Sequence, residues 1–168
     1  IITIITAFSN LFGRGGAPLA SIKLGEKNPK EAERILGNAF SSLVLTSIII
    51  MICLLLWGDR ILILFGASQK TLPYALSYLR IYSVGTIFIQ LTVGLNYFIN
   101  TQGYAKFGMM TLLIGGILNI ILDPIFIYAL HMNVAGAALA TIISQFISCI
   151  WVLSFLFGKK TTIKIKKE

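Results

Sequence analysis

The segment "FGMMTLLIGGILNIILDPIFIYA", residues 107–129, decides the fold class of this chain. It contains no Lys or Arg and a single acidic residue, Asp123. A helix needs about 20 apolar residues, at about 1.5 Å each, to cross the hydrocarbon core of a bilayer. The apolar residues are continuous rather than alternating, which argues against a membrane-spanning strand. The segment therefore predicts a transmembrane helix.

Three further apolar segments are of comparable length, namely 36–57, 74–99 and 134–157. A fifth, 1–24, is interrupted by Arg14. The chain is 57% hydrophobic and only 12% charged, with a mean hydropathy of +0.87. A soluble domain carries about 25% charged residues. None of the segments has the cleavage site of a signal peptide. We therefore predict an all-α, polytopic helical membrane protein with about five transmembrane helices.

The two ends of the sequence predict that residues 1–168 are a fragment. The chain begins at Ile1, already inside an apolar segment, and ends in a lysine-rich stretch, 158–168, that we interpret as a basic linker. Cys53 and Cys149 each stand alone in a predicted span, so no metal-binding spacing or disulfide framework is visible.

The basic residues predict the orientation in the membrane. Ten fall on the side reached after the first helix and three on the opposite side. By the positive-inside rule, the ten lie in the cytoplasm, which places loops 25–34 and 100–106 and the tail 158–168 there. This accounts for the net charge of +8, so we expect no nucleic-acid partner. The ten are Lys23, Lys27, Lys30, Arg34, Lys106, Lys159, Lys160, Lys164, Lys166 and Lys167; the three are Arg60, Lys70 and Arg80.

Asp123 is the only acidic residue inside a predicted span. A carboxylate at the centre of a bilayer costs about 2.5–3.5 kcal/mol, so such residues usually face the protein interior or a wet cavity and handle ions or protons. Asp123 lies about 25 Å along the helix from Lys106, in its outer half. The alternative is an Asp-Pro pair near a helix end that reaches the interface.

The neighbours of Asp123 favour an ion site. Asn119 lies four residues earlier, so the two side chains share one face of the helix. Pro124 has no N–H, which leaves the carbonyl of Ile120 without its helical partner and predicts a bend. A carboxylate, an amide and a freed carbonyl are hard oxygen ligands that suit a small cation or hold a proton.

Two further polar residues are candidates for the same site. Thr141 belongs to a polar stripe on the last span, and a connection of about five residues makes that span the antiparallel neighbour of 107–129. Thr141 should then lie within a turn or two of Asp123 in depth. Asn96 lies on the preceding span, toward its cytoplasmic end. For both, the alternative role is hydrogen bonding between helices.

Five stretches, in this order, resemble the multidrug and toxic compound extrusion (MATE) family of cation-coupled efflux transporters. They are "GGAPLASIKLGEKN", "LFGASQKTLPYALSYLRI", "LNYFINTQGYAKFGM", "LNIILDPIFIYAL" and "VAGAALATIISQ". The resemblance covers essentially the whole chain, and its strength lies in the order and spacing of the stretches rather than in any one of them.

The resemblance implies twelve spanning helices in two six-helix lobes. This chain then covers the second to sixth helices, and its partners are the missing first helix and carboxyl lobe of the same protein. The cation site of such an amino lobe matches Asn119, Asp123 and Thr141, and Asn96 less closely. Arg14 departs from the small or apolar residue expected before the double glycine.

The expected function is a sodium- or proton-coupled antiporter in the cell membrane that exports drugs or other small organic, often cationic, compounds. Its surroundings are the lipid bilayer, and no cofactor is expected beyond the coupling ion, with sodium held by Asp123, Asn119 and Thr141. The alternatives are a flippase for lipid-linked substrates in the same superfamily and a non-transporting membrane scaffold. No nucleophile–base pair, metal motif or phosphate loop indicates an enzyme.

Overall fold

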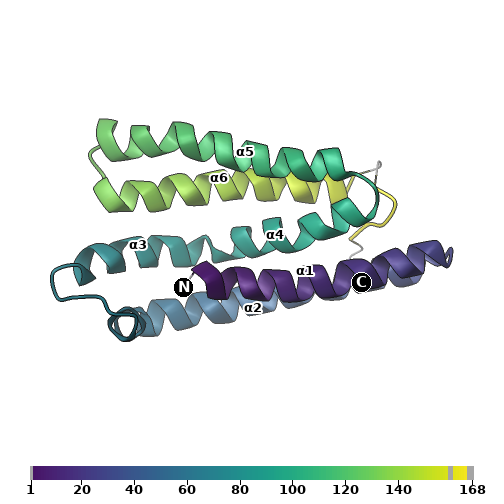
Figure 1. The fold of residues 1–168 in the computed structure, drawn as a ribbon, viewed down its shortest axis with the longest axis horizontal. Coiled ribbons are helices and arrows are strands. Elements are labelled where there is room, and N and C mark those ends of the chain that lie inside the picture. The colour runs from purple at the N-terminus through teal and green to yellow at the C-terminus, as the bar shows by residue number, and fades with distance from the viewer. Residues whose placement is uncertain (1, 159–160, 166–168) are drawn as a thin grey trace.

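The computed structural model describes residues 2–158 and 161–165. Within these ranges the chain forms helices and no strand, which confirms the all-α prediction (Figure 1). The elements are α1 (Ile2–Gly25), α2 (Pro29–Leu64), α3 (Leu72–Val84), α4 (Thr86–Thr101), α5 (Ala105–Pro124), the π-helical turn η1 (Ile125–Ala129) and α6 (Asn133–Leu156).

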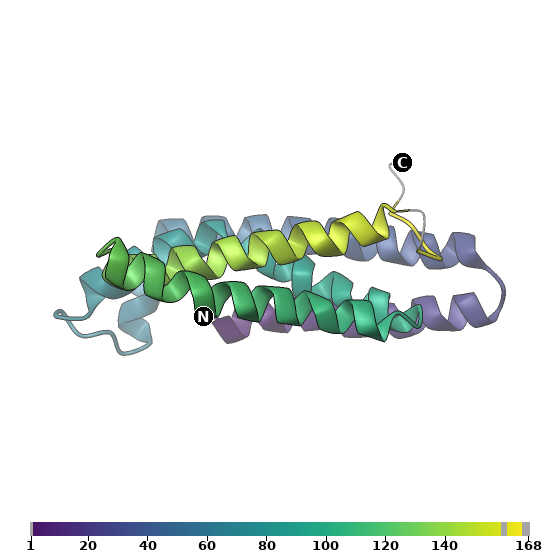
Figure 2. The same ribbon diagram turned by 90° about the horizontal axis from the view of Figure 1, so that it is seen from above.

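The helices lie side by side in an elongated bundle (Figures 1 and 2). α5 and α6 form an antiparallel pair on one side, and α1 and α2 form another pair on the opposite side. α4 contacts α1, α2, α5 and α6, so it is the central helix of the bundle. The end of the bundle that holds the α1–α2 and α4–α5 turns is the one to which the chain returns after α6.

In the described part of the chain, three helical segments are long and apolar enough to cross a membrane: α2, α5 together with η1, and α6. The α3–α4 pair qualifies as a fourth, bent by 55°. α1, which corresponds to the interrupted segment 1–24, is long enough but falls short of the apolarity of the others. It packs against α2 and α4, both of which belong to the membrane-crossing set.

The segment 74–99, expected to be one helix, is broken at Gly85. On the α3 side of the break, the Ser83 hydroxyl donates a hydrogen bond to the carbonyl of Leu79 at 2.6 Å, and Thr86 donates to the carbonyl of Tyr82 at 3.5 Å. Hydroxyls that bond back to the preceding turn bend helices. α6 also presses against the break, since a Cβ at Gly85 would overlap the side chain of Ile142.

α2 extends well beyond the expected span 36–57 at both ends. The Asn28 side chain accepts a hydrogen bond from the Glu31 N–H at 3.3 Å, and Pro29 occupies the first helical position. This capping arrangement starts the helix in the loop before the apolar segment. Near the end of the expected span, Trp57 departs from helical geometry (φ −119°, ψ 15°), so the helix is kinked there.

Small residues allow the helices around α4 to approach closely. A Cβ at Gly13 of α1 would lie 2.8 Å from the carbonyl oxygen of Gly94 in α4, and a Cβ at Gly94 would lie 2.6 Å from a methyl carbon of Leu43 in α2. Helices in membranes associate through such close packing, because lipid is as apolar as the side chains it surrounds. Large side chains then fill the centre, among them Leu36, Leu95, Phe98, Val152 and Leu156.

Part of the chain after α6, predicted to be a basic linker, packs against the bundle. Ile163 is fully buried and Ile165 is 9% exposed, and both join the core formed by α1, α2, α4 and α6. The remaining lysines of this predicted linker, at 159, 160, 166 and 167, lie outside the described residues.

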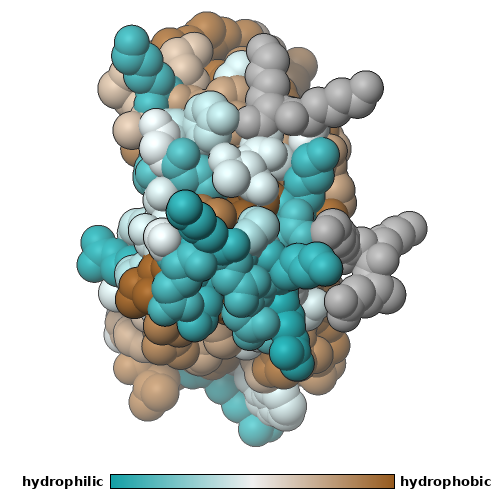
Figure 3. Space-filling model, turned by 90° about the vertical axis from the view of Figure 1, so that its right-hand side faces the viewer, coloured by the Kyte–Doolittle hydropathy of each residue, from teal (hydrophilic) through white to brown (hydrophobic). Residues whose placement is uncertain are grey.

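The polar surface gathers at this same end of the bundle (Figure 3). The face shown carries a broad hydrophilic area with hydrophobic surface above and below it. Exposed apolar side chains along the helices, such as Leu45, Leu112 and Ile120, give the bundle the lipid-facing surface that a membrane protein requires.

Candidate cation-binding site

Three polar side chains from two helices meet at one point of the bundle. Asn119 and Asp123 lie one turn apart on α5, and Thr141 lies on α6, which packs antiparallel beside it. The Asn119 side-chain nitrogen lies 3.3 Å from Asp123 Oδ1 and 3.4 Å from Thr141 Oγ1. The structure therefore brings together three of the four residues that the sequence predicts for the site.

The hydrogen bonds leave oxygen lone pairs at the centre of this cluster. The Thr141 hydroxyl donates its proton to the carbonyl of Ala137 at 2.9 Å, so its oxygen can only accept from other groups. Asn119 turns its nitrogen toward both neighbours, so its carbonyl oxygen faces away from them and reaches a shared cation only if the amide turns over. With the Asp123 carboxylate, these are hard oxygen ligands of the kind that bind a small cation.

Pro124 changes the helix directly after the cluster. The expected break of direction is not found, since α5 and η1 form one span through Pro124. The irregularity is instead a π turn after the proline, in which the Leu130 N–H bonds to the carbonyl of Ile125 at 3.0 Å. Because proline cannot donate to Ile120, the backbone beside Asp123 has one carbonyl without its usual helical partner. π turns inside helices often accompany functional sites.

Tyr78 of α3 is a member of the cluster that we did not predict. Its phenol lies beside the side chain of Thr141. The ring also stacks on Tyr82, one turn along α3, with 5.5 Å between centroids. In the sequence, the only relevant signal was the spacing of four residues between Tyr78 and Tyr82, which places both rings on one face of a helix. Such a pair is common on packed helix faces and does not indicate a binding site.

Asn96 does not join the cluster. Its side-chain nitrogen donates to the carbonyl of Gly108 at 3.2 Å, at the opposite end of α5. Gly108 lies eleven residues before Asn119 on one helix, which is a separation of about 16 Å. Asn96 is buried and its Oδ1 has no partner among the described residues. Asn96 therefore makes a hydrogen bond between helices, which was the alternative role that the sequence suggested for it.

The polar stripe of α6 beyond Thr141 serves mainly to join helices. Ser148 donates to the carbonyl of Thr111 on α5 at 3.3 Å, and Thr92 of α4 donates to the carbonyl of Gln145 at 3.4 Å. Gly115 permits this approach, because a Cβ there would lie 2.8 Å from Ser148 Oγ. Thr141 thus differs from the rest of the stripe in facing a carboxylate.

Comparisons with known proteins identify the family of the chain. The family model MatE matches residues 1–125, about three quarters of the chain. The chain belongs to the MATE family. The multidrug export protein MepA of Staphylococcus haemolyticus is 37% identical over 164 residues, which is 97% of this chain and 36% of that protein. MepA of Staphylococcus saprophyticus is 28% identical over 97% of this chain.

Solved MATE structures share the fold. A multidrug resistance MATE transporter in an inward-facing conformation matches with a TM-score of 0.92 at 27% identity, covering 96% of this chain and 37% of that one. The outward-facing conformation of a MATE transporter matches at 0.90 and 28% identity, with 96% and 36% covered. The chain thus spans about 36% of the length of the curated relatives that it matches.

Arg14, the departure from the MATE pattern, joins two helices. Its Nε donates to the hydroxyl of Tyr97 on α4 at 3.1 Å, and its guanidinium lies 5.6 Å from the centre of that ring. The Tyr97 hydroxyl in turn donates to Asn10 Oδ1 of α1 at 2.8 Å. Because Tyr97 lies one turn before the end of α4, this network sits toward the polar end of the bundle, away from Asp123.

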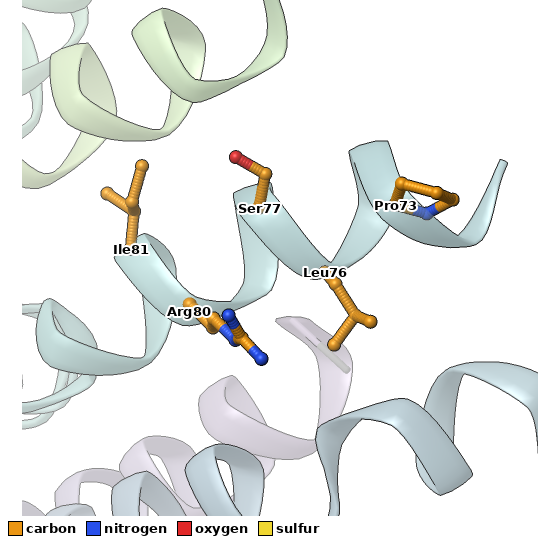
Figure 4. A pocket seen from close by; sticks show the side chains of 5 residues that line it. All are labelled: Pro73, Leu76, Ser77, Arg80 and Ile81. Carbon is orange, nitrogen blue, oxygen red and sulfur yellow. The ribbon is translucent and has the colours of Figure 1, made fainter.

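A cavity of about 380 Å³ lies along α3 and does not include the cluster. Its lining residues all belong to α3, with Ser77 and Ile81 on one side of the helix and Leu76 and Arg80 on the other (Figure 4). Arg80, expected near the outer end, lies eight residues inside the helix. Nowhere in residues 2–158 and 161–165 do three His, Cys, Asp or Glu side chains gather as a metal site.

Proposed function

We propose that the protein carrying this chain is a cation-coupled antiporter that exports drugs or other organic compounds, and that Asp123 binds the coupling ion, sodium or a proton. The observation that carries this proposal is the meeting of the half-buried Asn119, Asp123 and Thr141 within hydrogen-bonding distance between α5 and α6. A carboxylate at such a place needs a compensating charge or a proton.

The chemistry of the cluster suits exchange between two cations. Sodium binds to the ionised carboxylate together with the neutral oxygens of Asn119 and Thr141. A proton on Asp123 removes the charge that holds sodium, so the two ions exclude one another. One carboxylate can therefore release one ion as it takes up the other, which is the step that a coupled antiporter needs.

In this proposal, Tyr78 couples ion binding at the cluster to the position of α3. An ion can shift a conformational equilibrium only if it binds the two states differently. Through Thr141, Tyr78 connects the site to α3, which meets α4 at the break beside Gly85. We infer that occupancy of the site changes the preferred angle between α3 and α4. A small change of backbone torsion at the break between two helices rotates one whole helix relative to the other.

The comparisons support movement of this lobe largely as a unit, so that any change of the α3–α4 angle within it is small. The chain resembles MATE structures described as inward-facing and outward-facing almost equally, with TM-scores of 0.92 and 0.90. Rocking of one repeat against the other around a central site is the usual route to alternating access. In this proposal the second lobe belongs to the part of the protein outside this chain.

We place the polar end of the bundle in the cytoplasm and the protein in the cell membrane. At this end Lys27 lies in the α1–α2 connection, and Lys30 and Lys106 lie in the first turns of α2 and α5, in keeping with the positive-inside rule. We take the exported compounds to be drugs or other organic compounds, because the relatives are named multidrug export proteins. A flippase for lipid-linked substrates would not need the Asn119–Asp123–Thr141 cluster.

The test compares two Asp-to-Asn substitutions in the complete reading frame that encodes this chain. Asp123→Asn keeps the size of the side chain but removes its titratable charge. Asp59→Asn makes the same change at an exposed position of α2 beyond the kink at Trp57. Ethidium efflux is measured in cells that lack their own efflux pumps, with an imposed sodium or proton gradient.

We expect Asp123→Asn to lower gradient-driven efflux at least about tenfold, while Asp59→Asn leaves it unchanged. The substitution removes the charge that holds the coupling ion, and a tenfold loss corresponds to about 1.4 kcal/mol. Membrane insertion of both variants is checked by the amount of protein in the membrane fraction. Wild-type efflux by Asp123→Asn under the same gradient would show that the carboxylate only packs at a helix end.

A further inference from the structure

Residues 161–165, which we call the strap, fold back onto the polar end of the bundle after α6. The side-chain oxygen of Gln102, the residue that follows α4, accepts three hydrogen bonds from it. The donors are the Thr161 hydroxyl at 2.7 Å, the Thr162 N–H at 2.9 Å and the Ile163 N–H at 3.1 Å. One side chain thus satisfies consecutive backbone groups of a segment that has no helix or strand of its own.

The geometry of Gln102 is specific to this role. Two of the donors are backbone N–H groups, which cannot accept, so the amide must present its oxygen to the strap. Its nitrogen points the other way and donates to the carbonyl of Phe98 at 3.1 Å. The Thr161 hydroxyl is also 2.7 Å from the carbonyl of Ile163, so its single proton is shared between that carbonyl and Gln102.

The strap also bridges several helices. The fully buried Ile163 and the nearly buried Ile165 belong to the same core as Leu36 of α2 and Leu156 of α6. The Lys164 N–H lies 3.4 Å from a carboxylate oxygen of Glu33 on α2. The ends of α2, α4 and α6 are therefore joined by one short segment.

We propose that Gln102 is the latch of this strap, so that residues up to Ile165 move with the lobe and do not lengthen the connection to the rest of the transporter. This inference rests on the proposed function. Five extended residues reach about 17 Å, which docking removes from the connection. A shorter connection keeps the polar ends of the two lobes closer together, because effective concentration falls as a tether lengthens.

Hydrogen–deuterium exchange in the purified protein from the complete reading frame tests the latch directly. In the wild type, the amides of Thr162 and Ile163 should exchange slowly. Gln102→Leu removes the acceptor at similar size and should speed their exchange at least about tenfold, since the local opening energy falls with the lost hydrogen bonds. Gln102→Glu keeps an acceptor oxygen and should retain most of the protection. Thr162→Ala is the matched control, because only its backbone N–H takes part.

If the wild-type amides exchange as fast as those of an unstructured peptide, the strap is not docked on the bundle. If exchange is unchanged in Gln102→Leu, Gln102 does not hold the strap in place. Efflux of ethidium tests the consequence: release of the strap should lower it about two- to threefold, the cost of a longer tether. Unchanged efflux with a released strap would refute the claim that the docked strap keeps the polar ends of the two lobes close together. A wild type without any efflux would instead refute the proposed function, while exchange still decides the latch.

Discussion

Gly85 lies against Ile142 so closely that a Cβ at position 85 would overlap Cγ1 of the isoleucine. The break between α3 and α4 is therefore also a point of close contact with α6. The glycine is needed here for space, since its φ of −77° is open to any residue.

We predict that Gly85→Ala destabilises the protein by about 1–3 kcal/mol, the usual cost of overpacking a filled site. The matched control is Gly116→Ala on α5, where a Cβ would meet nothing within 4 Å. Thermal unfolding of the detergent-purified protein measures both. Equal melting temperatures for the two variants would mean that the α3–α6 contact relaxes without cost.

Substitutions at Asn119 and Thr141 should weaken ion coupling less than Asp123→Asn does, because they remove a neutral ligand and leave the carboxylate. We expect Asn119→Ala and Thr141→Ala to raise the sodium or proton concentration needed for half-maximal efflux about 2- to 12-fold each, the equivalent of one hydrogen bond. Thr141→Ser keeps the hydroxyl and should stay near wild type. A complete loss of efflux in Thr141→Ser would contradict the ligand role and indicate a packing role for the methyl group.

Tyr78→Phe should also weaken coupling, since it removes the hydroxyl that interacts with Thr141 and keeps the ring that stacks on Tyr82. The expected change is again about 2- to 12-fold in the ion concentration for half-maximal efflux. Tyr74→Phe on the same helix is the control, because Tyr74 is 64% exposed. Equal effects of the two substitutions would show that the Tyr78 hydroxyl has no specific role in ion coupling.

The orientation can be tested with single cysteines at positions 27 and 69, both exposed and at opposite ends of α2 and its flanking turns. In a background without Cys53 and Cys149, a membrane-impermeant maleimide added to intact cells should label position 69 and miss position 27. The reason is the excess of basic residues on the side of position 27. Labelling of position 27 from outside would reverse the proposed topology.

Much of this protein is determined by the sequence alone. Long apolar segments predict spanning helices, because a bilayer leaves no other way to satisfy the backbone. The capping of α2 follows from Asn28 and Pro29, which act on the turn next to them. The shared face of Asn119 and Asp123 follows from the helical period, and the short turn after η1 places Thr141 beside them.

Other features were decided only by the tertiary structure. Tyr78 meets Thr141 because α3 lies against α6, whereas Asn96 bonds to Gly108 and stays away from the cluster. The apolar pattern of 74–99 does not reveal a break at Gly85, and the lysine-rich tail conceals the burial of Ile163. Hydropathy and helical period are properties of neighbouring residues. Which distant side chains share one space depends instead on how separate helices pack, and no single segment contains that information.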